Sequence, residues 1–113
     1  MQEVEKSMEQ LIQVLYRSKE YNQYQTLLGK IKEKEELFRR IGEYRRRIIY
    51  LQKSNTENLI QANNDLENEF RDLQNNVLVN EYLVAEHQYC KMIQKLQEQF
   101  LEAACIETGF LDE

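Results

Sequence analysis

The near absence of turn-forming residues constrains this chain more than any other feature. Its 113 residues contain no proline and only three glycines, Gly29, Gly42 and Gly109. Proline and glycine set the turns of hairpin-rich folds, so their scarcity argues against a β-sandwich or a β-barrel. Leu, Glu, Gln, Lys, Arg and Asn make up most of the sequence, and all but Asn are good helix formers. The sequence therefore predicts one all-α domain over residues 1–113.

Apolar residues recur at helical spacing along the chain, and the breaks between segments coincide with capping residues. The first segment, residues 4–15, is expected to end at Arg17. Ser18 follows with an acidic residue two positions later, which is typical of the N-cap of a new helix. This second segment should end between residues 32 and 34.

Two polar stretches mark the later breaks. Residues 54–56 form the clearest turn, and Asn55 or Thr56 is expected to cap the fourth segment. Residues 74–76 form a second break, where an asparagine can cap the last helix. This helix should cover about 77–106. A helix of ~30 residues spans ~45 Å, whereas a compact domain of this size has a radius of gyration near ~13 Å. We therefore expect an elongated helical bundle. The third to fifth segments would form a long antiparallel hairpin, with the two short N-terminal helices packed on it.

The third and last segments carry the apolar seam of this bundle. The third repeats with coiled-coil spacing, and the last presents a wider apolar face. The predicted core and oligomer seam consists of Leu37, Ile41, Tyr44, Ile48, Leu51, Tyr82, Tyr89, Ile93, Leu96 and Phe100. Gly42 lies within it and indicates either a close approach of another backbone or a tolerated surface glycine. Because an elongated bundle leaves apolar surface uncovered, we expect a homodimer.

Charge and cysteine content narrow the class of protein. The net charge is −5, and an acidic total argues against a dedicated nucleic-acid binder. No apolar run approaches the ~20 residues that span a bilayer, and the N-terminus lacks the pattern of a signal peptide. Cys90 and Cys105 would lie about 22 Å apart on one helix, too far for a disulfide. These features predict a soluble cytoplasmic protein without membrane insertion.

Arginines form a stripe on the third segment, on the side opposite Ile41 and Ile48. Its members are spaced seven apart in two pairs: Arg39 and Arg46, Arg40 and Arg47. The stripe could be solvated and paired with nearby glutamates. Alternatively, it could be a partner surface for an acidic protein or contact RNA phosphates. We favour the ion-paired interpretation and do not expect direct RNA binding, but the sequence leaves all three open.

The search for catalytic and ligand-binding patterns finds little. The chain lacks a glycine-rich phosphate loop. Its one histidine, His87, is three positions before Cys90, and a closed zinc site needs four ligands. We expect Cys90 to be a small core residue and His87 to face solvent. The sequence therefore predicts no catalytic residue, no cofactor and no metal, and a protein that is not an enzyme.

Tyrosines occupy apolar-periodic positions in the second and last segments, at Tyr21, Tyr24, Tyr82 and Tyr89. Core packing with a hydrated hydroxyl is the usual outcome for such positions. Tyrosine is also common at protein interfaces. The sequence does not separate these two roles.

Three stretches of the chain carry a family resemblance: SKEYNQY at 18–24, IGEYR at 41–45 and NVLVNEYLVAE at 76–86. In this order and spacing they resemble the YlbF/YmcA-type competence regulators of Gram-positive bacteria, over about residues 4–110. The resemblance implies an all-α helical hairpin that forms homodimers or mixed complexes with paralogues.

The resemblance also implies a function. Family members are non-enzymatic regulators of competence, sporulation and biofilm formation, and some assist a membrane-bound endoribonuclease in RNA maturation. One branch has a cysteine-rich tail associated with iron–sulfur binding; with only two cysteines, this chain is not expected to hold a cluster. We therefore expect a regulatory protein-interaction module with a ribonuclease as one candidate partner. The alternatives are a structural helical dimer and an RNA-binding protein that uses the Arg39–Arg47 stripe.

Overall fold

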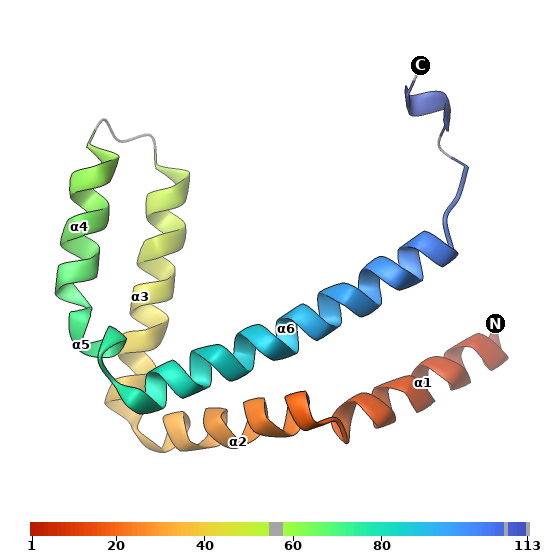
Figure 1. Ribbon diagram of the computed structural model, residues 1–113, viewed down its shortest axis with the longest axis horizontal. Coiled ribbons are helices and arrows are strands. Elements are labelled where there is room, and N and C mark those ends of the chain that lie inside the picture. Colours follow the sequence, from red (N-terminus) through yellow and green to blue (C-terminus); the bar gives the residue numbers. More distant parts are fainter. Residues whose placement is uncertain (55–57, 108, 113) are drawn as a thin grey trace.

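The computed structural model describes residues 1–54, 58–107 and 109–112, and these residues form six α-helices, a short 3-10 helix and no strand. The helices are α1 Gln2–Tyr16, α2 Lys19–Glu33, α3 Glu35–Lys53, α4 Leu59–Glu69, α5 Arg71–Gln74 and α6 Val77–Ala103, and the 3-10 helix is η1 Gly109–Asp112. Figure 1 shows them in chain order. The all-α prediction is confirmed.

Two antiparallel helix pairs meet at an elbow (Figure 1). In the first arm, α6 runs back along α2, and α1 continues beyond the start of α2 toward the far end of α6. In the second arm, α3 and α4 lie side by side and point away from the first arm. The short α5 connects α4 to α6 at the elbow.

The molecule is elongated, as expected. Its principal extents are 50 × 44 × 18 Å and its Cα radius of gyration is 19.3 Å, against ~13 Å for a compact chain of about this length. Two arms that diverge from one elbow leave a large share of each helix without a neighbour. Burial is therefore concentrated at the elbow.

Side-chain caps begin α2 and α6 where the sequence predicts them. The Ser18 hydroxyl accepts a hydrogen bond from the Tyr21 backbone N–H at 3.2 Å and starts α2. The Asn76 side-chain oxygen accepts one from the Val79 N–H at 3.0 Å and starts α6. Each cap satisfies a backbone donor that has no partner within its helix.

The core lies at the elbow, where the five helices α2 to α6 converge, and Leu66 is the residue that α4 contributes. Ile31 of α2 and Phe70, between α4 and α5, are fully buried. Ile41 of α3, Leu73 of α5 and Val79 of α6 complete the same cluster. Because the core draws on every helix of both arms except α1, the elbow is the part of the chain where the arms stabilise each other.

A polar contact joins the arms beside this core. The Arg45 guanidinium on α3 donates to Glu86 Oε1 on α6 at 2.7 Å. The Tyr82 hydroxyl donates to Glu86 Oε2 at 3.1 Å, and Arg45 also lies over the Tyr82 ring. Burial lowers the pKa of Arg45, but hydrogen bonding and charge attraction from Glu86 outweigh it and raise this pKa overall. The raised pKa keeps the Arg45 guanidinium charged, and its contact with Glu86 links α3 to α6.

The pairing of the helices differs from the expected one. The long helix α6 pairs with α2, and α3 pairs with α4 instead of with the last helix. The expected fourth segment is also interrupted at Phe70, whose backbone leaves the helical region and separates α4 from α5. The last helix begins at Val77 as predicted and ends at Ala103, three residues before its expected end. Seam spacing reveals an apolar face but not which helix covers it.

Three further predictions concern the end of the second helix, the cap of α4 and the role of Gly42. The second helix ends at Glu33, within the predicted range. Asn55 and Thr56 lie outside the described residues, so the expected cap of α4 cannot be assigned to them. Among the described residues of the chain, a Cβ at Gly42 would meet only the Arg46 guanidinium, at 3.2 Å. Within the described part of one chain, no other backbone therefore requires a glycine at this position.

Candidate protein-interaction surfaces

The helix α1 contributes nothing to the core. None of its side chains is buried, and Val4, Met8 and Leu11 are 64%, 44% and 47% exposed. An isolated helix of this length is only marginally stable in water, because tertiary packing supplies most helical stability. Within the described residues, the apolar face of α1 is therefore largely uncovered.

The far end of α6 adds to the same surface. Phe100, which is 59% exposed, lines an open cleft of about 430 Å³ together with Val4, Met8 and Leu11. Leu96 and Leu101 are also exposed. We call these six side chains the distal apolar surface: Val4, Met8, Leu11, Leu96, Phe100 and Leu101.

The predicted seam divides between core and surface. Its α3 members are all at least half-buried, and Ile41 is fully within the core. On α6, Tyr82 is buried and Tyr89 and Ile93 are half-buried, whereas Leu96 and Phe100 are exposed. From the elbow outward, the seam residues of α3 are Leu37, Ile41, Tyr44, Ile48 and Leu51. The chain thus covers its own seam near the elbow and leaves it open at the far end of α6.

The arginine stripe is engaged within the chain. Arg40 pairs with Asp72 at 2.6 Å and Arg47 with Glu69 at 2.5 Å, so both bridge α3 to the α4–α5 segment. Their guanidinium groups lie 4.9 and 5.4 Å from the centre of the Phe70 ring. These two arginines therefore bridge the helices of the second arm; the Arg40 side chain is 26% exposed and that of Arg47 is 44% exposed.

The outer two arginines are more exposed. Arg39 pairs with Glu36 at 2.6 Å and with Glu43 at 3.1 Å along α3. The hydrogen bond and charge of Arg39 lower the pKa of Glu36, and Glu36 in turn raises the pKa of Arg39. Arg46 forms no ion pair with any described residue and lies beside Gly42. Three of the four stripe residues are thus neutralised inside the chain.

Stacked tyrosines fill the interface between α2 and α6. Tyr24 lies between Tyr82 and Tyr89, with ring centres 5.9 and 5.5 Å away, and Tyr21 lies 5.5 Å from Tyr89. Tyr16, at the end of α1, extends the row at 4.9 Å from Tyr21. Burial, and then the neighbouring tyrosines, raise the pKa of Tyr89. These rings are therefore packing residues of the first arm; sequence periodicity found four of them and missed Tyr16.

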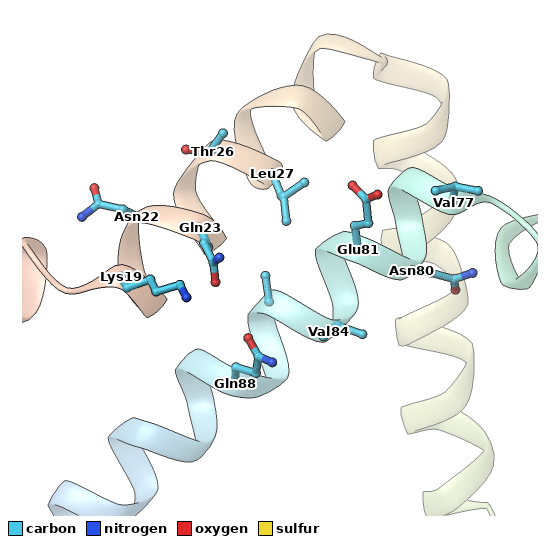
Figure 2. A pocket seen from close by; sticks show the side chains of 11 residues that line it. Lys19, Asn22, Gln23, Thr26, Leu27, Val77, Asn80, Glu81, Val84 and Gln88 are labelled. Carbon is cyan, nitrogen blue, oxygen red and sulfur yellow. The ribbon is translucent and has the colours of Figure 1, made fainter.

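Another face of the first arm carries an open groove of about 760 Å³ between α2 and α6. Figure 2 shows the α2 side chains Lys19, Gln23 and Thr26 on one side and Val84 and Gln88 of α6 on the other. The apolar side chains of the groove are Leu27, Val77, Val84 and Ala85, and its polar ones are mostly amides. Sequence analysis missed this groove because its residues do not form a continuous apolar stripe.

A comparison with known protein families finds one family that matches this chain. Residues 4–103 match the family described as control of competence regulator ComK, YlbF/YmcA. The chain belongs to the YlbF/YmcA family. The match covers nearly the whole chain and confirms the resemblance carried by residues 18–24, 41–45 and 76–86. No curated protein and no solved structure gave a match in these comparisons.

The YlbF/YmcA chain places its histidine and cysteines on the surface. His87 is exposed, as expected, but Cys90 is exposed too, so its assignment to the core is wrong. The reason is the wide face of α6: Tyr82 and Tyr89 contact α2, and Cys90 lies one position further around the helix. Across the described residues no three His, Cys, Asp or Glu side chains are grouped as metal ligands.

The helices in the described part of this YlbF/YmcA chain do not have the features of membrane-spanning helices. None of its helices combines the length and the apolar character that a bilayer crossing requires. The longest, α6, carries charged residues along its length.

Proposed function

We propose that this YlbF/YmcA-family chain is a non-enzymatic regulatory module that acts by binding other proteins. Membership of a family described as controlling a competence regulator supports a regulatory role. The observation that carries the proposal is the distal apolar surface, which exposes Val4, Leu11 and Phe100 on adjoining helices. Contiguous apolar surface of this kind is typical of protein interaction sites.

Self-association is the first interaction we propose for this surface. The α1 helix and the end of α6 line one cleft with apolar side chains. A second copy related by a two-fold axis would present the same surface, and a two-fold interface is self-complementary. A paralogue with a similar α1 could take the place of the second copy. Either pairing would form a four-helix layer and cover α1.

Leu11→Glu tests this assembly. A carboxylate in the middle of the distal apolar surface would lose its water on association, so we expect dimer formation to weaken at least ~tenfold. Light scattering over a concentration series measures the mass. Ile60→Glu is the matched control, because Ile60 is 79% exposed on α4, in the other arm, and should leave the mass unchanged.

Two results would count against self-association. One is a wild-type mass that stays monomeric at every concentration. The other is equal loss of dimer in the Ile60→Glu control, which would indicate general destabilisation. Circular dichroism of each variant shows whether the helices are retained.

We further propose that the module assists endoribonuclease-dependent RNA maturation through protein contacts, as its family resemblance implies. The ion pairs of Arg39, Arg40 and Arg47 argue against direct RNA contact through the stripe. Tagged wild-type protein recovered from its host should retain a ribonuclease or a paralogue after nuclease treatment. Loss of all partners on nuclease treatment would favour RNA binding, and recovery of the chain alone would favour a purely structural dimer.

A further inference from the structure

We propose that the groove between α2 and α6 binds an acidic amphipathic helix of a partner protein; this inference rests on the interaction role proposed above and names a second, separate surface for it. The groove lies on a different part of the first arm from the distal apolar surface, and the two share no residue. It extends along α6 from Val77 to Gln88, about 17 Å at the helical rise per residue. That length matches three turns of a helix.

The walls and floor of the groove fit a helix. Ala85 is buried, while Val84 is 56% exposed and borders the same groove. Gln23 and Gln88 provide amide groups at the rim that can donate and accept hydrogen bonds, whereas the Asn22 amide donates to the Ser18 carbonyl within the chain. A narrow apolar floor with a polar rim is the surface that an amphipathic helix recognises through residues at i, i+3, i+4 and i+7.

Lysines border this groove although the chain as a whole is acidic. Lys19 lines it directly. Lys30 and Lys91 continue the same helix faces, because Lys30 follows Thr26 by four positions and Lys91 follows Gln88 by three. None of these lysines forms an ion pair with a described residue, in contrast to most of the arginine stripe. Glu81 is the acidic side chain that lines the groove.

The positions of these charges set the orientation of the bound helix. Lys19 and Lys91 lie toward the Gln88 end, whereas Lys30 and Glu81 both lie toward the Val77 end, where their opposite charges offset each other. The C-terminus of a helix is electronegative and its N-terminus is electropositive. The partner helix therefore runs parallel to α6, with its acidic residues concentrated toward its C-terminal end.

Two other occupants fit less well. The α1 helix of a second copy is acidic, but its acids lie in its N-terminal half at Glu3, Glu5 and Glu9, and Arg17 follows its C-terminus. In a two-fold exchange Arg17 would approach Lys19, which is the wrong charge order. Single-stranded RNA is disfavoured because the groove lacks aromatic rings on which bases could stack.

Two labelled peptide probes of identical composition test the inference. Each has about 14 residues with Leu and Ala at i, i+3, i+4 and i+7; one carries its Glu residues in the last turn and the other in the first. By fluorescence anisotropy we expect the first probe to bind the full chain at least ~tenfold more tightly than the second. Val84→Lys and Lys19→Glu should each weaken the first probe at least ~tenfold.

Ile49→Lys is the matched control, because Ile49 is 51% exposed on α3, away from the groove, and it should bind the probe as the wild type does. The inference is overturned if neither probe binds, or if Val84→Lys binds as tightly as the wild type. It is also overturned if Val84→Lys reduces self-association in light scattering, or if a uridine oligonucleotide binds the groove in place of the probes.

Failure of the two proposals can be told apart. Leu11→Glu should abolish dimers yet keep probe binding, because Leu11 does not line the groove. Retained dimers in Leu11→Glu with normal probe binding would reject the self-association surface alone. Normal dimers in Val84→Lys, without any probe binding to the wild type, would reject the groove alone.

Discussion

The single side chain of Phe70 explains why two arginines of the stripe, Arg40 and Arg47, turn toward the α4–α5 segment. Its ring has no exposed surface and interrupts the helix between α4 and α5. Arg40 and Arg47 lie against it, and the Tyr44 ring is 5.1 Å away. A guanidinium over an aromatic ring contributes about 0.5–2 kcal/mol, more when water is excluded. Arg40 and Arg47 thus bind α3 to the α4–α5 segment.

Ionisation of the single side chain of Tyr82 should make the free energy of unfolding depend on pH. Burial, then the nearby Glu86 charge, raise the pKa of Tyr82 well above its ordinary value. Since the folded state holds this proton more tightly than the unfolded chain, stability is complete below the ordinary tyrosine pKa of ~10 and falls as pH rises beyond it. We expect the free energy of unfolding, from urea titrations, to decline above about pH 10, and to decline less steeply in Tyr82→Phe.

Tyr50 provides the comparison for this titration, because its side chain is exposed. Tyr50→Phe should leave the alkaline decline unchanged. An identical decline in wild type and Tyr82→Phe would show that other groups cause it.

Helix caps account for much of what the sequence specifies at the element scale. Asn76→Ala removes the acceptor of the Val79 N–H at the start of α6 and should lower the free energy of unfolding by about 0.5–2 kcal/mol. Asn58→Ala is the control, because Asn58 occupies the N-cap position of α4 without a side-chain cap hydrogen bond. Urea unfolding compares the two; equal losses would contradict the assigned role of Asn76.

Helix starts were predictable from sequence because capping is local. Ser18 and Asn76 are recognised from the few residues that follow them, and both caps are present. The break at Phe70 was not predictable, since its spacing fits a continuous helix and only packing against α3 reveals its role. The exposure of Cys90 was missed for the same reason: it depends on which helix covers α6.

The candidate surfaces were predictable only in part. Helical spacing identified Leu96 and Phe100 as apolar seam residues, and the structure shows that this chain leaves them uncovered. The groove beside Val84 was not predictable from sequence, because it is formed by two helices that are far apart along the chain. Pairing α6 with α2 requires contacts between distant segments, which apolar spacing within one segment does not encode.

Across the whole molecule, the angle between the arms depends on the elbow. The Arg45–Glu86 pair is the polar link between α3 and α6 beside the core. We expect Glu86→Gln to broaden the distance distribution between the arms, because the charged contact that fixes α3 against α6 is lost. Spin labels on the exposed Cys90 and on a Gln61→Cys substitution in α4, with Cys105→Ser, measure this distance by pulsed electron resonance.

Glu43→Gln is the matched control for the elbow. Glu43 pairs with Arg39 within α3, so its loss should leave the distance between the arms unchanged. A narrow distribution in Glu86→Gln would show that the apolar core alone fixes the angle.

The bare face of α1 also bears on how long the protein survives in the cell. A helix without a buried side chain opens at little cost, and proteases cleave what opens. Copies without a companion should therefore be trimmed at their N-terminus and cleared, whereas assembled copies persist. The quantity of this protein would then follow the supply of its companions, whatever its own rate of synthesis.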